Sequence, residues 1–416
     1  MIDRSSTGII ATLCWALNIA LALVFAVARA RAGETVIHQF NQSQGYYPNS
    51  GLVSDAAGNF YGTTSAGGKN NCGTAFELSP GSNGTWTETL LFSFHGCQFP
   101  GPSPIGTMVF DQAGNLYGAA QGDFNTDGVI YKLSKGAGNT WSETIIHSFG
   151  LSEGTPLGDL AFDNAGNLYG ATSAPYTTFD GEIFELSPQP DGTWTETVLI
   201  TFPAANGVGG PAGGPIFDSK GNLYGATFYG IGGYEGNSRG AVYELSPQAN
   251  GPWTLTVLYN FTKASTTQFP ESRLTFDSSG NLYGTAEGGS FYGSIFEVSP
   301  GSAGGAWTET TIHSFNSGSD GGNPRGTLVV DTAGNVYGAT SAGGIGCNGN
   351  LCGTVCKFTP QSAGTWKETI LHPFESATDG SIPEAGVFMD SSGNLYGTTY
   401  HGGGRYGYGT VYEITP

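Results

Sequence analysis

The chain has 416 residues and a formal net charge of −19 at pH 7; 11% of its residues are charged and 69 are glycine. This composition argues against long helices and for an all-β protein with many tight turns. The negative charge argues against nucleic acid as a partner, because phosphate binding needs clustered lysine and arginine.

Residues 1–32 have the features of a secretory signal peptide. Arg4 precedes an apolar run over residues 9–28, and the small residues that follow offer a cleavage site after Ala32. An uncleaved membrane anchor is the alternative, because the apolar run is long. We therefore expect a secreted, periplasmic or cell-surface protein with no membrane span after cleavage, whose folded part is residues 33–416.

Residues 34–40, with the sequence ETVIHQF, are expected to form a strand that belongs to the end of a repeat. The same pattern returns at residues 143–149, 309–315 and 368–374. Each later copy completes a longer unit, whereas residues 34–40 stand alone before the first unit. The isolated copy is therefore expected to complete a unit elsewhere in the fold.

A turn motif divides the rest of the chain into seven similar units. It reads Asp-x-x-Gly-Asn, then Leu, Phe or Val, then Tyr-Gly, and its copies begin 52 to 59 residues apart. The seven copies start at Asp55, Asp111, Asp163, Asp218, Asp277, Asp331 and Asp390. Asp accepts hydrogen bonds from turn amides and Gly adopts positive φ without strain, so the motif predicts a hairpin turn.

Each unit contains four extended runs, which we name a, b, c and d in chain order. In one unit they cover residues 327–331, 335–340, 353–360 and 366–372, each rich in β-branched and aromatic residues. Seven such units predict an all-β, seven-bladed β-propeller with four-stranded antiparallel blades. Because the chain finishes on run c at residues 409–416, we expect the N-terminal strand to join the last three strands as their outer strand and close the ring.

The repeat core resembles that of the GloVer tandem-repeat family, a group of exported bacterial proteins of the choice-of-anchor tandem-repeat type. The resemblance lies in the motif Asp-x-x-Gly-Asn-Leu-Tyr-Gly-Thr-Thr and in the later Gly-Thr-Val-Phe-Glu-Leu segment, and it covers residues 34–416. It implies export and little about chemistry. Runs a and b are also similar to the inner hairpin of NHL-type propellers.

In a four-stranded meander the b–c and d–a connections share one face, and their sequences vary most between units. We expect this variable face to bind ligands. Its candidate ligand-binding residues are Arg239, Arg273, Arg325, Arg405, Tyr229, Tyr234, Tyr292 and Tyr406. The tyrosines could stack on sugar rings, and Arg273 and Arg325 could hold an anionic group such as a uronate or a sulfate.

Five cysteines follow the predicted cleavage site. In an exported protein we expect two disulfides on the variable face, Cys347 with Cys352 and Cys72 with Cys97. Cys356 takes a run c position that is aromatic in other units, which predicts a buried free thiol. Metal binding by the cysteines is the alternative.

Metal signals are weak. Asp123, Asn125 and Asp127 match the first half of a calcium loop, but the later acidic positions are absent, so an Asx-rich turn is the alternative. His38, His147, His313 and His372 share one repeat position that is apolar in other units, which predicts packing or a side-chain hydrogen bond. His95 and His401 lie in connections on the variable face. We expect no cofactor, apart from the calcium alternative.

The sequence favours a non-catalytic, monomeric binding module for polysaccharide or another cell-surface polymer. It holds no nucleophile elbow, phosphate loop or dinucleotide motif. The first alternative is a hydrolase or lyase at the mouth of the central channel, using loop carboxylates such as Asp180, Glu235 and Glu287. The second is a structural or protein-interaction propeller.

Overall fold

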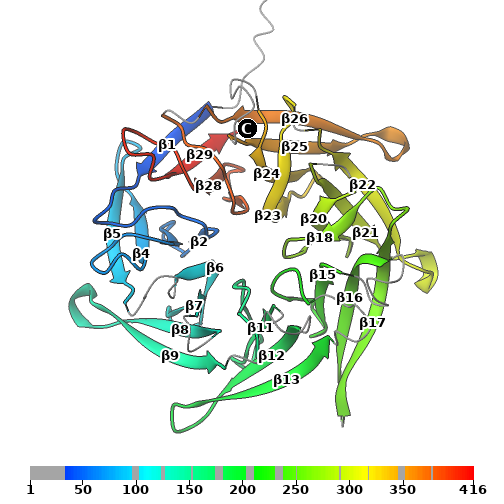
Figure 1. The fold of residues 1–416 in the computed structure, drawn as a ribbon, viewed down its shortest axis with the longest axis horizontal. Coiled ribbons are helices and arrows are strands. Elements are labelled where there is room, and N and C mark those ends of the chain that lie inside the picture. The colour runs from blue at the N-terminus through cyan, green and yellow to red at the C-terminus, as the bar shows by residue number, and fades with distance from the viewer. Residues whose placement is uncertain are drawn as a thin grey trace, which may run out of the picture.

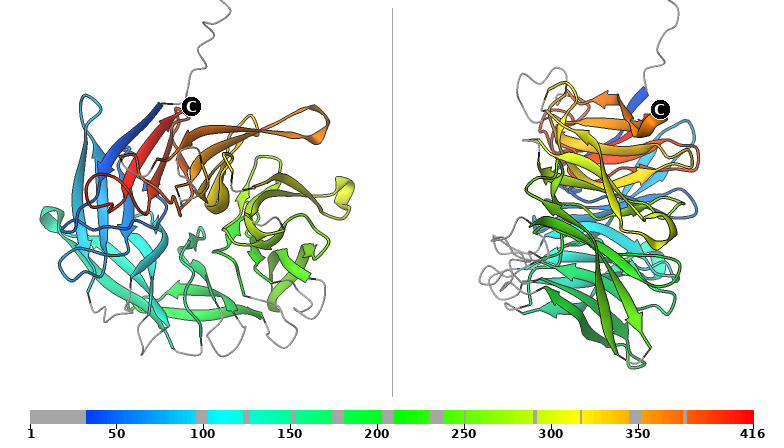
Figure 2. Two further views of the ribbon diagram at one scale, coloured as in Figure 1. Left: turned by 45° about the horizontal axis from the view of Figure 1, so that its top comes forward. Right: turned by 90° about the vertical axis from the view of Figure 1, so that its right-hand side faces the viewer.

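The computed structural model describes most of the chain after residue 32. The described ranges are 33–95, 103–122, 127–150, 153–173, 181–202, 210–229, 238–249, 251–289, 292–316, 318–344, 352–375 and 378–416. They form seven antiparallel sheets that follow one another around a ring, with a disc-like outline from the side (Figures 1 and 2). The predicted seven-bladed β-propeller is confirmed.

We number the blades in chain order. Blade 1 has β2 (Val53–Ser54), β3 (Phe60–Thr64), β4 (Thr74–Pro80) and β5 (Trp86–Ser93). Blade 2 has β6 (Pro104–Phe110), β7 (Leu116–Gln121), β8 (Gly128–Lys135) and β9 (Trp141–Phe149). Blade 3 has β10 (Ala161–Phe162), β11 (Leu168–Thr172), β12 (Gly181–Pro188) and β13 (Trp194–Phe202). Blade 4 has β14 (Ile216–Phe217), β15 (Leu223–Thr227), β16 (Ser238–Gln248) and β17 (Gly251–Thr262).

The remaining blades repeat this order. Blade 5 has β18 (Gln268–Pro270), β19 (Thr275–Phe276), β20 (Leu282–Gly288), β21 (Ser294–Ser299) and β22 (Thr308–Ser314). Blade 6 has β23 (Gly322–Val330), β24 (Val336–Ala342), β25 (Thr354–Pro360) and β26 (Trp366–Pro373). Blade 7 has β27 (Phe388–Met389), β28 (Leu395–Thr399), β29 (Thr410–Thr415) and, from the N-terminus, β1 (Gly33–Gln39).

Blade 7 closes the ring as the sequence predicted. Strand β1 pairs antiparallel with β29, with Gly33 opposite Thr415 and His38 opposite Val411. In Figure 1 the blue N-terminal strand lies beside the red C-terminal strand. No sheet edge is left open between the two ends of the described chain.

Short 3₁₀ turns are the only helices in the described ranges: η1 (Ala137–Asn139), η3 (Ser302–Gly304) and η4 (Ser362–Gly364). Within these ranges no helix has the length and apolar character that crossing a membrane requires. The predicted signal peptide lies outside the described residues and stays a prediction.

The aspartate of the repeat motif organises each a–b turn. In blade 2, Asp111 Oδ1 accepts hydrogen bonds from the backbone N–H of Ala113 and Asn115, both at 2.9 Å. Its Oδ2 accepts from Asn115 Nδ2 at 2.7 Å and from the Tyr117 hydroxyl at 3.2 Å. The same four contacts recur at Asp55, Asp163, Asp218, Asp277, Asp331 and Asp390.

These contacts stabilise the ionised form of the Asp111 side chain, whose role is structural. Burial raises its pKa, but the hydrogen bonds from Asn115, Ala113 and Tyr117 outweigh burial and hold the pKa below its ordinary value. We expect Asp111→Ala to lower the free energy of unfolding by about 2 to 3 kcal/mol at pH 7, because hydrogen bonds to a charged acceptor are lost. Urea denaturation measures this. Asp191→Ala is the control, since Asp191 is exposed and bonds only to Thr193 among the described residues; equal losses in both variants would contradict the role of the turn.

The motif tyrosine joins neighbouring blades. The Tyr117 ring of blade 2 packs against Phe162 at 5.0 Å and Trp194 at 5.9 Å, both in blade 3. The glycine after it has no room for a side chain, because a Cβ on Gly118 would lie 2.3 Å from the Tyr131 hydroxyl. Seven apolar clusters, each shared by two adjacent blades, form the core.

The repeated histidine of run d lies in the seam between two blades. His38 Nε2 is 3.4 Å from Glu88 Oε2 of the next blade, and His147 Nε2 is 3.4 Å from Glu196 Oε2. Every run d has a β-bulge one residue before this repeat position, whether or not a histidine occupies it. In β1 the bulge is at Ile37, where the register with β29 shifts. The bulge turns the histidine to the face opposite the run's own glutamate.

Candidate functional site

A recurring proline orders the d–a segments on the variable face. It occurs in every blade. In blades 2 to 6 it pairs with a residue near the C-terminal end of run b, beside the b–c loop. The seven prolines are Pro48, Pro104, Pro156, Pro211, Pro270, Pro324 and Pro383. We call the next residue the post-proline position.

The post-proline position is charged in three successive blades. It is Glu271 in blade 5, Arg325 in blade 6 and Glu384 in blade 7, and we call these three residues the charged triad. The other blades have Asn49, Ile105, Leu157 and Ala212. Only Arg325 of the triad was predicted as a site residue, although the proline spacing in the sequence is a signal that would have found the other two.

The triad residues interact with one another. Arg325 Nη1 lies 3.2 Å from Glu271 Oε1, and the two side chains are 40% and 26% exposed. Burial raises the pKa of Glu271, Arg325 lowers it, and the charges of Glu287 and Glu384 raise it again; the net result is a raised pKa. The carboxyl group of Glu271 is thus held between one positive and two negative groups.

Arg273 lies two residues beyond the post-proline position, whereas Arg325 occupies that position. The two arginines are therefore not equivalent in their blades. Its Nη2 donates to the Pro215 carbonyl oxygen at 3.4 Å, while its Nε is buried and has no hydrogen-bond partner among the described residues. Burial lowers the pKa of Arg273, and the charge of Asp159 opposes this. The structure therefore places the two arginines in separate surroundings, one with Glu271 and one with Asp159.

Five tyrosines gather where blades 7 and 1 meet, and we call Tyr46, Tyr47, Tyr400, Tyr406 and Tyr408 the tyrosine cluster. Tyr47 stacks on Tyr400 at 4.8 Å, Tyr46 packs on Tyr408 at 4.9 Å, and Tyr406 stacks on Tyr408 at 5.5 Å. Of the predicted residues, Tyr406 is here and 66% exposed. The guanidinium of Arg405 lies 5.6 Å from its ring centroid.

Several contacts fix the tyrosine cluster. Tyr47 has φ of 59°, a conformation that costs a non-glycine residue about 1 kcal/mol or more. Its N–H donates to the Tyr408 carbonyl at 2.9 Å, and its carbonyl accepts from Ser65 N–H at 3.0 Å. The Tyr46 hydroxyl donates to Asn71 Oδ1 at 2.8 Å. These bonds join a d–a segment to b–c loops on both sides.

The tyrosine cluster adjoins the charged triad. The Tyr400 N–H donates to the Ile382 carbonyl at 3.0 Å, two residues before Glu384. Burial raises the pKa of Tyr400, Ser65 lowers it, and the charge of Glu384 raises it further. His401, a predicted free candidate, packs edge-on against both Tyr47 and Tyr400 at 4.8 Å.

A second aromatic group borders the triad in blades 4 and 5. Phe269, which precedes Pro270, stacks on Phe228 at 5.3 Å and contacts Tyr229 at 5.9 Å. The guanidinium of Arg239 lies 5.8 Å from the Phe269 ring centroid. Two predicted residues, Tyr229 and Arg239, are thereby brought together. Tyr292 is 40% exposed, and its carbonyl accepts from Asn323 N–H at 2.7 Å.

The remaining predicted site residues are only partly described. Asp123, Asn125, Tyr234, Cys97 and Cys347 lie outside the described residues, as do Asp180 and Glu235. Asp127 Oδ2 accepts from Gly154 N–H at 3.2 Å. The calcium loop stays a prediction.

The cysteines are described in part. Cys72 and Cys352 are buried, and the free cysteine among the described residues is Cys356, which is 1% exposed as predicted. Since their expected partners are not described, both disulfide pairings stay predictions.

Two solved structures are similar to this chain at low identity. A proposed 6-phosphogluconolactonase from Bacteroides uniformis has a TM-score of 0.50 and 13% identity, covering 79% of this chain and 85% of its own. An α-L-arabinanase from Penicillium chrysogenum has a TM-score of 0.46 and 16% identity, with coverages of 81% and 96%. At these identities the likeness concerns the fold alone.

The sequence comparisons give the family. No curated protein sequence matches the chain. The Gloeobacter/Verrucomicrobia repeat matches it twice, over residues 17–209 and 181–412. Because these matches together span nearly the whole chain, the protein belongs to the Gloeobacter/Verrucomicrobia repeat family.

Proposed function

We propose that this protein binds a saccharide on its variable face without cleaving it, as an exported propeller at or beyond the cell surface. The observation that carries the proposal is the tyrosine cluster. It presents stacked, partly exposed tyrosine side chains where blades 7 and 1 meet. Tyrosine suits sugars because its ring packs on the apolar face of a pyranose while its hydroxyl can hydrogen-bond. The packing and hydrogen bonds that fix these rings reduce the entropy lost on binding.

The charged triad supplies hydrogen-bonding groups beside the rings. Arg325 and Glu271 are partly exposed and offer donors and acceptors to sugar hydroxyls. Among the described residues, the charge of Arg325 lowers the pKa of Glu271, whereas the charges of Glu287 and Glu384 raise it. Three carboxylates around one guanidinium favour a neutral saccharide over an acidic one. The earlier hypothesis of a uronate or sulfate at Arg273 and Arg325 therefore becomes the alternative outcome of the test.

Calorimetry on residues 33–416 with neutral and uronate-containing oligosaccharides tests the proposal. We expect neutral oligosaccharides to bind better, and Tyr406→Ala to weaken binding about two- to tenfold, the value of one aromatic contact. Ile145→Ala is the control, because Ile145 is 46% exposed on the outer strand β9. Stronger binding of uronates, lost in Arg325→Ala, would favour the anionic hypothesis and contradict ours; no binding by any glycan in a broad array would remove the proposal.

A glycoside hydrolase is the second candidate, and the raised pKa of Glu271 favours it. A general acid needs a carboxyl group that stays protonated near neutral pH, and a second carboxylate must lie nearby. Glu384 and Glu287 both act on Glu271. Product analysis of the bound glycan, with Glu271→Gln as the inactive variant, separates the two functions: turnover that Glu271→Gln abolishes while binding persists would show an enzyme.

A further inference from the structure

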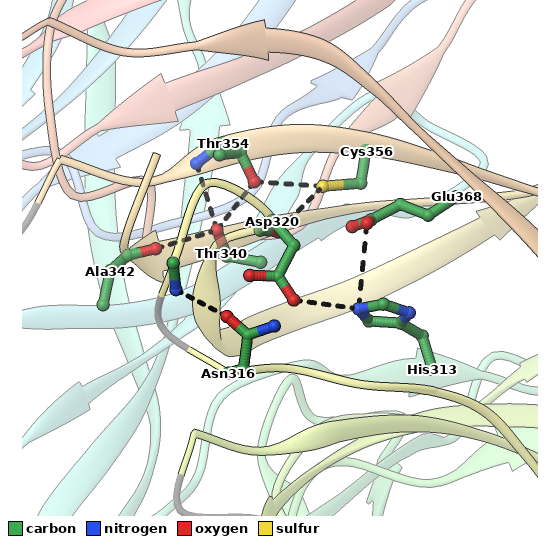
Figure 3. Close-up of polar contacts among 9 residues, drawn as sticks. His313, Asn316, Asp320, Thr340, Ala342, Thr354, Cys356 and Glu368 are labelled. Atoms are coloured by element: carbon green, nitrogen blue, oxygen red, sulfur yellow. Dashed lines mark hydrogen bonds and ion pairs between the residues drawn. The ribbon is translucent and has the colours of Figure 1, made fainter. Parts of the chain in front are cut away.

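A second polar site lies in the seam between blades 5 and 6, apart from the tyrosine cluster. His313 comes from β22, Asp320 from the segment between β22 and β23, and Glu368 from β26 (Figure 3). The thiol of Cys356, on β25, lies beside them. These four residues come from three different strands and one connection, so the propeller fold itself brings them together.

The three side chains converge at distances that suit one metal ion. His313 Nε2 is 3.4 Å from Asp320 Oδ2 and 3.8 Å from Glu368 Oε2, and one ligand atom from each residue lies within 4.8 Å of the other two. Tetrahedral zinc with bonds of about 2.0 to 2.2 Å separates its ligand atoms by roughly 3.3 to 3.6 Å. A small inward movement of Glu368 would complete this geometry.

Unused acceptors point to a missing partner. Asp320 Oδ1 is buried and accepts no hydrogen bond from any described residue, and the Glu368 carboxyl group, whose Oε1 is buried, has the Cys356 thiol as a hydrogen-bonding neighbour. The side chains of His313, Asp320 and Glu368 keep 23%, 14% and 17% exposure, so an ion from solvent can reach them. Buried carboxylate oxygens without a donor are costly unless a cation compensates them.

The seam between blades 6 and 7 gives an internal comparison. There His372 Nε2 contacts Asp379 Oδ2 at 3.0 Å, and both oxygens of Asp379 accept the N–H of Glu375. The residue equivalent to Cys356 is Tyr412, whose ring is fully buried. That seam satisfies its aspartate with protein donors, although Oε1 of its glutamate, Glu34, is also buried without a partner among the described residues. The seam with Asp320 differs in its small thiol and in the spare oxygen of the aspartate itself.

We propose that His313, Asp320 and Glu368 bind a divalent transition-metal ion, zinc first, with the Cys356 thiolate in the fourth position. Imidazole, carboxylate and thiolate are the ligands that zinc takes in proteins. Cys356 Sγ is 3.0 Å from Thr354 Oγ1 and 4.0 Å from the Asp320 carbonyl oxygen, which places it at the edge of the three-residue set. The ion would link blade 5 to blade 6 and stabilise their seam.

Zinc titration of residues 33–416, prepared without a histidine tag and stripped with a chelator, tests the site. We expect one zinc per chain, a higher melting temperature with zinc, and at least about tenfold weaker binding in Glu368→Gln and His313→Ala. His372→Ala is the matched control and should bind as the wild type. Equal affinity of Glu368→Gln and wild type, or equal losses in His313→Ala and His372→Ala, would overturn the site.

Cobalt substitution tests the fourth ligand. The wild-type cobalt complex should show a sulfur-to-cobalt charge-transfer band in the near ultraviolet, and Cys356→Ser should lose that band while still binding the ion. A wild-type complex without the band would overturn the assignment of Cys356. Because glycan binding is measured separately at the tyrosine cluster, either result is independent of the proposed function.

Discussion

Deleting residues 33–41 from a protein of residues 33–416 is expected to abolish cooperative folding. The deletion removes β1, which pairs with β29, and Phe40, which is 4% exposed and packs against Phe76 of blade 1 at 5.1 Å. It leaves β29 as an open edge and two blade seams incomplete. The loss should be comparable with the whole stability of an ordinary domain, about 5 to 15 kcal/mol. Thermal unfolding followed by circular dichroism, with size-exclusion chromatography, measures it.

A circular permutant shows whether the deletion acts through the loss of β1 or through the new N-terminus at residue 42. It begins at residue 42 and continues through Pro416, a five-residue linker copied from residues 361–365, and residues 33–41. That linker joins Pro360 to Trp366, which lie opposite each other in blade 6, as Thr415 and Gly33 do in blade 7. The permutant should melt as the intact chain does. A monomeric deletion variant with an unchanged cooperative transition would show that β1 does not hold the ring closed.

The repeat explains why so much of the fold could be predicted. One turn motif recurs seven times, so the same local structure is predicted from seven copies. The isolated strand at residues 34–40 can complete only the last unit, which lacks its own run d. The aspartate turn is local, since the Asp111 side chain bonds to residues two, four and six positions ahead. Local hydrogen-bonding chemistry can be inferred from spacing alone.

The candidate site was harder to predict because it depends on differences between repeats. Arg273 and Arg325 occur in neighbouring repeats, yet they lie two positions apart when the prolines are aligned, so they have different neighbours. Glu271 was not predicted, because its importance comes from Arg325 in the next blade. Tyr47 and Tyr400 were missed for the same reason, since they are 353 residues apart in sequence but stack at 4.8 Å.

The histidines of run d show a second limit of sequence patterns. With a strict two-residue period, Glu34 and His38 would lie on the same face of β1. The bulge before His38 reverses this, so Glu34 faces blade 6, where the charge of His372 acts on it, and His38 faces blade 1. A period of two cannot predict a bulge, because the extra residue is an ordinary apolar one.

Replacing one partner of the His38–Glu88 seam should expose a hidden pH dependence. Burial lowers the pKa of His38 to about 4 and raises the pKa of Glu88 to about 7, so both groups prefer to be neutral in the folded protein. The contribution of His38 to the unfolding free energy is lost as pH falls below the ordinary histidine pKa. In that range the unfolded state binds a proton at His38 and the folded state does not. The Glu88 contribution is lost as pH rises above the ordinary glutamate pKa, because ionisation then favours the unfolded state. In the wild type these two dependences oppose each other.

Single variants remove one dependence and leave the other. Relative to the wild type, His38→Phe should lose about 2 kcal/mol of unfolding free energy as pH rises from 5 to 7.5, and Glu88→Gln should gain about 2 to 3 kcal/mol over the same range. This range stays above the pI of about 4.5. The double variant His38→Ile with Glu88→Leu copies the Ile200–Leu255 seam of the same protein, so its difference from the wild type should hardly change with pH. Urea denaturation at each pH gives these differences, in which the titration of all other groups cancels. Slopes of the opposite sign would mean that His38 and Glu88 form a charged pair, because a salt bridge raises the pKa of the histidine and lowers that of the glutamate.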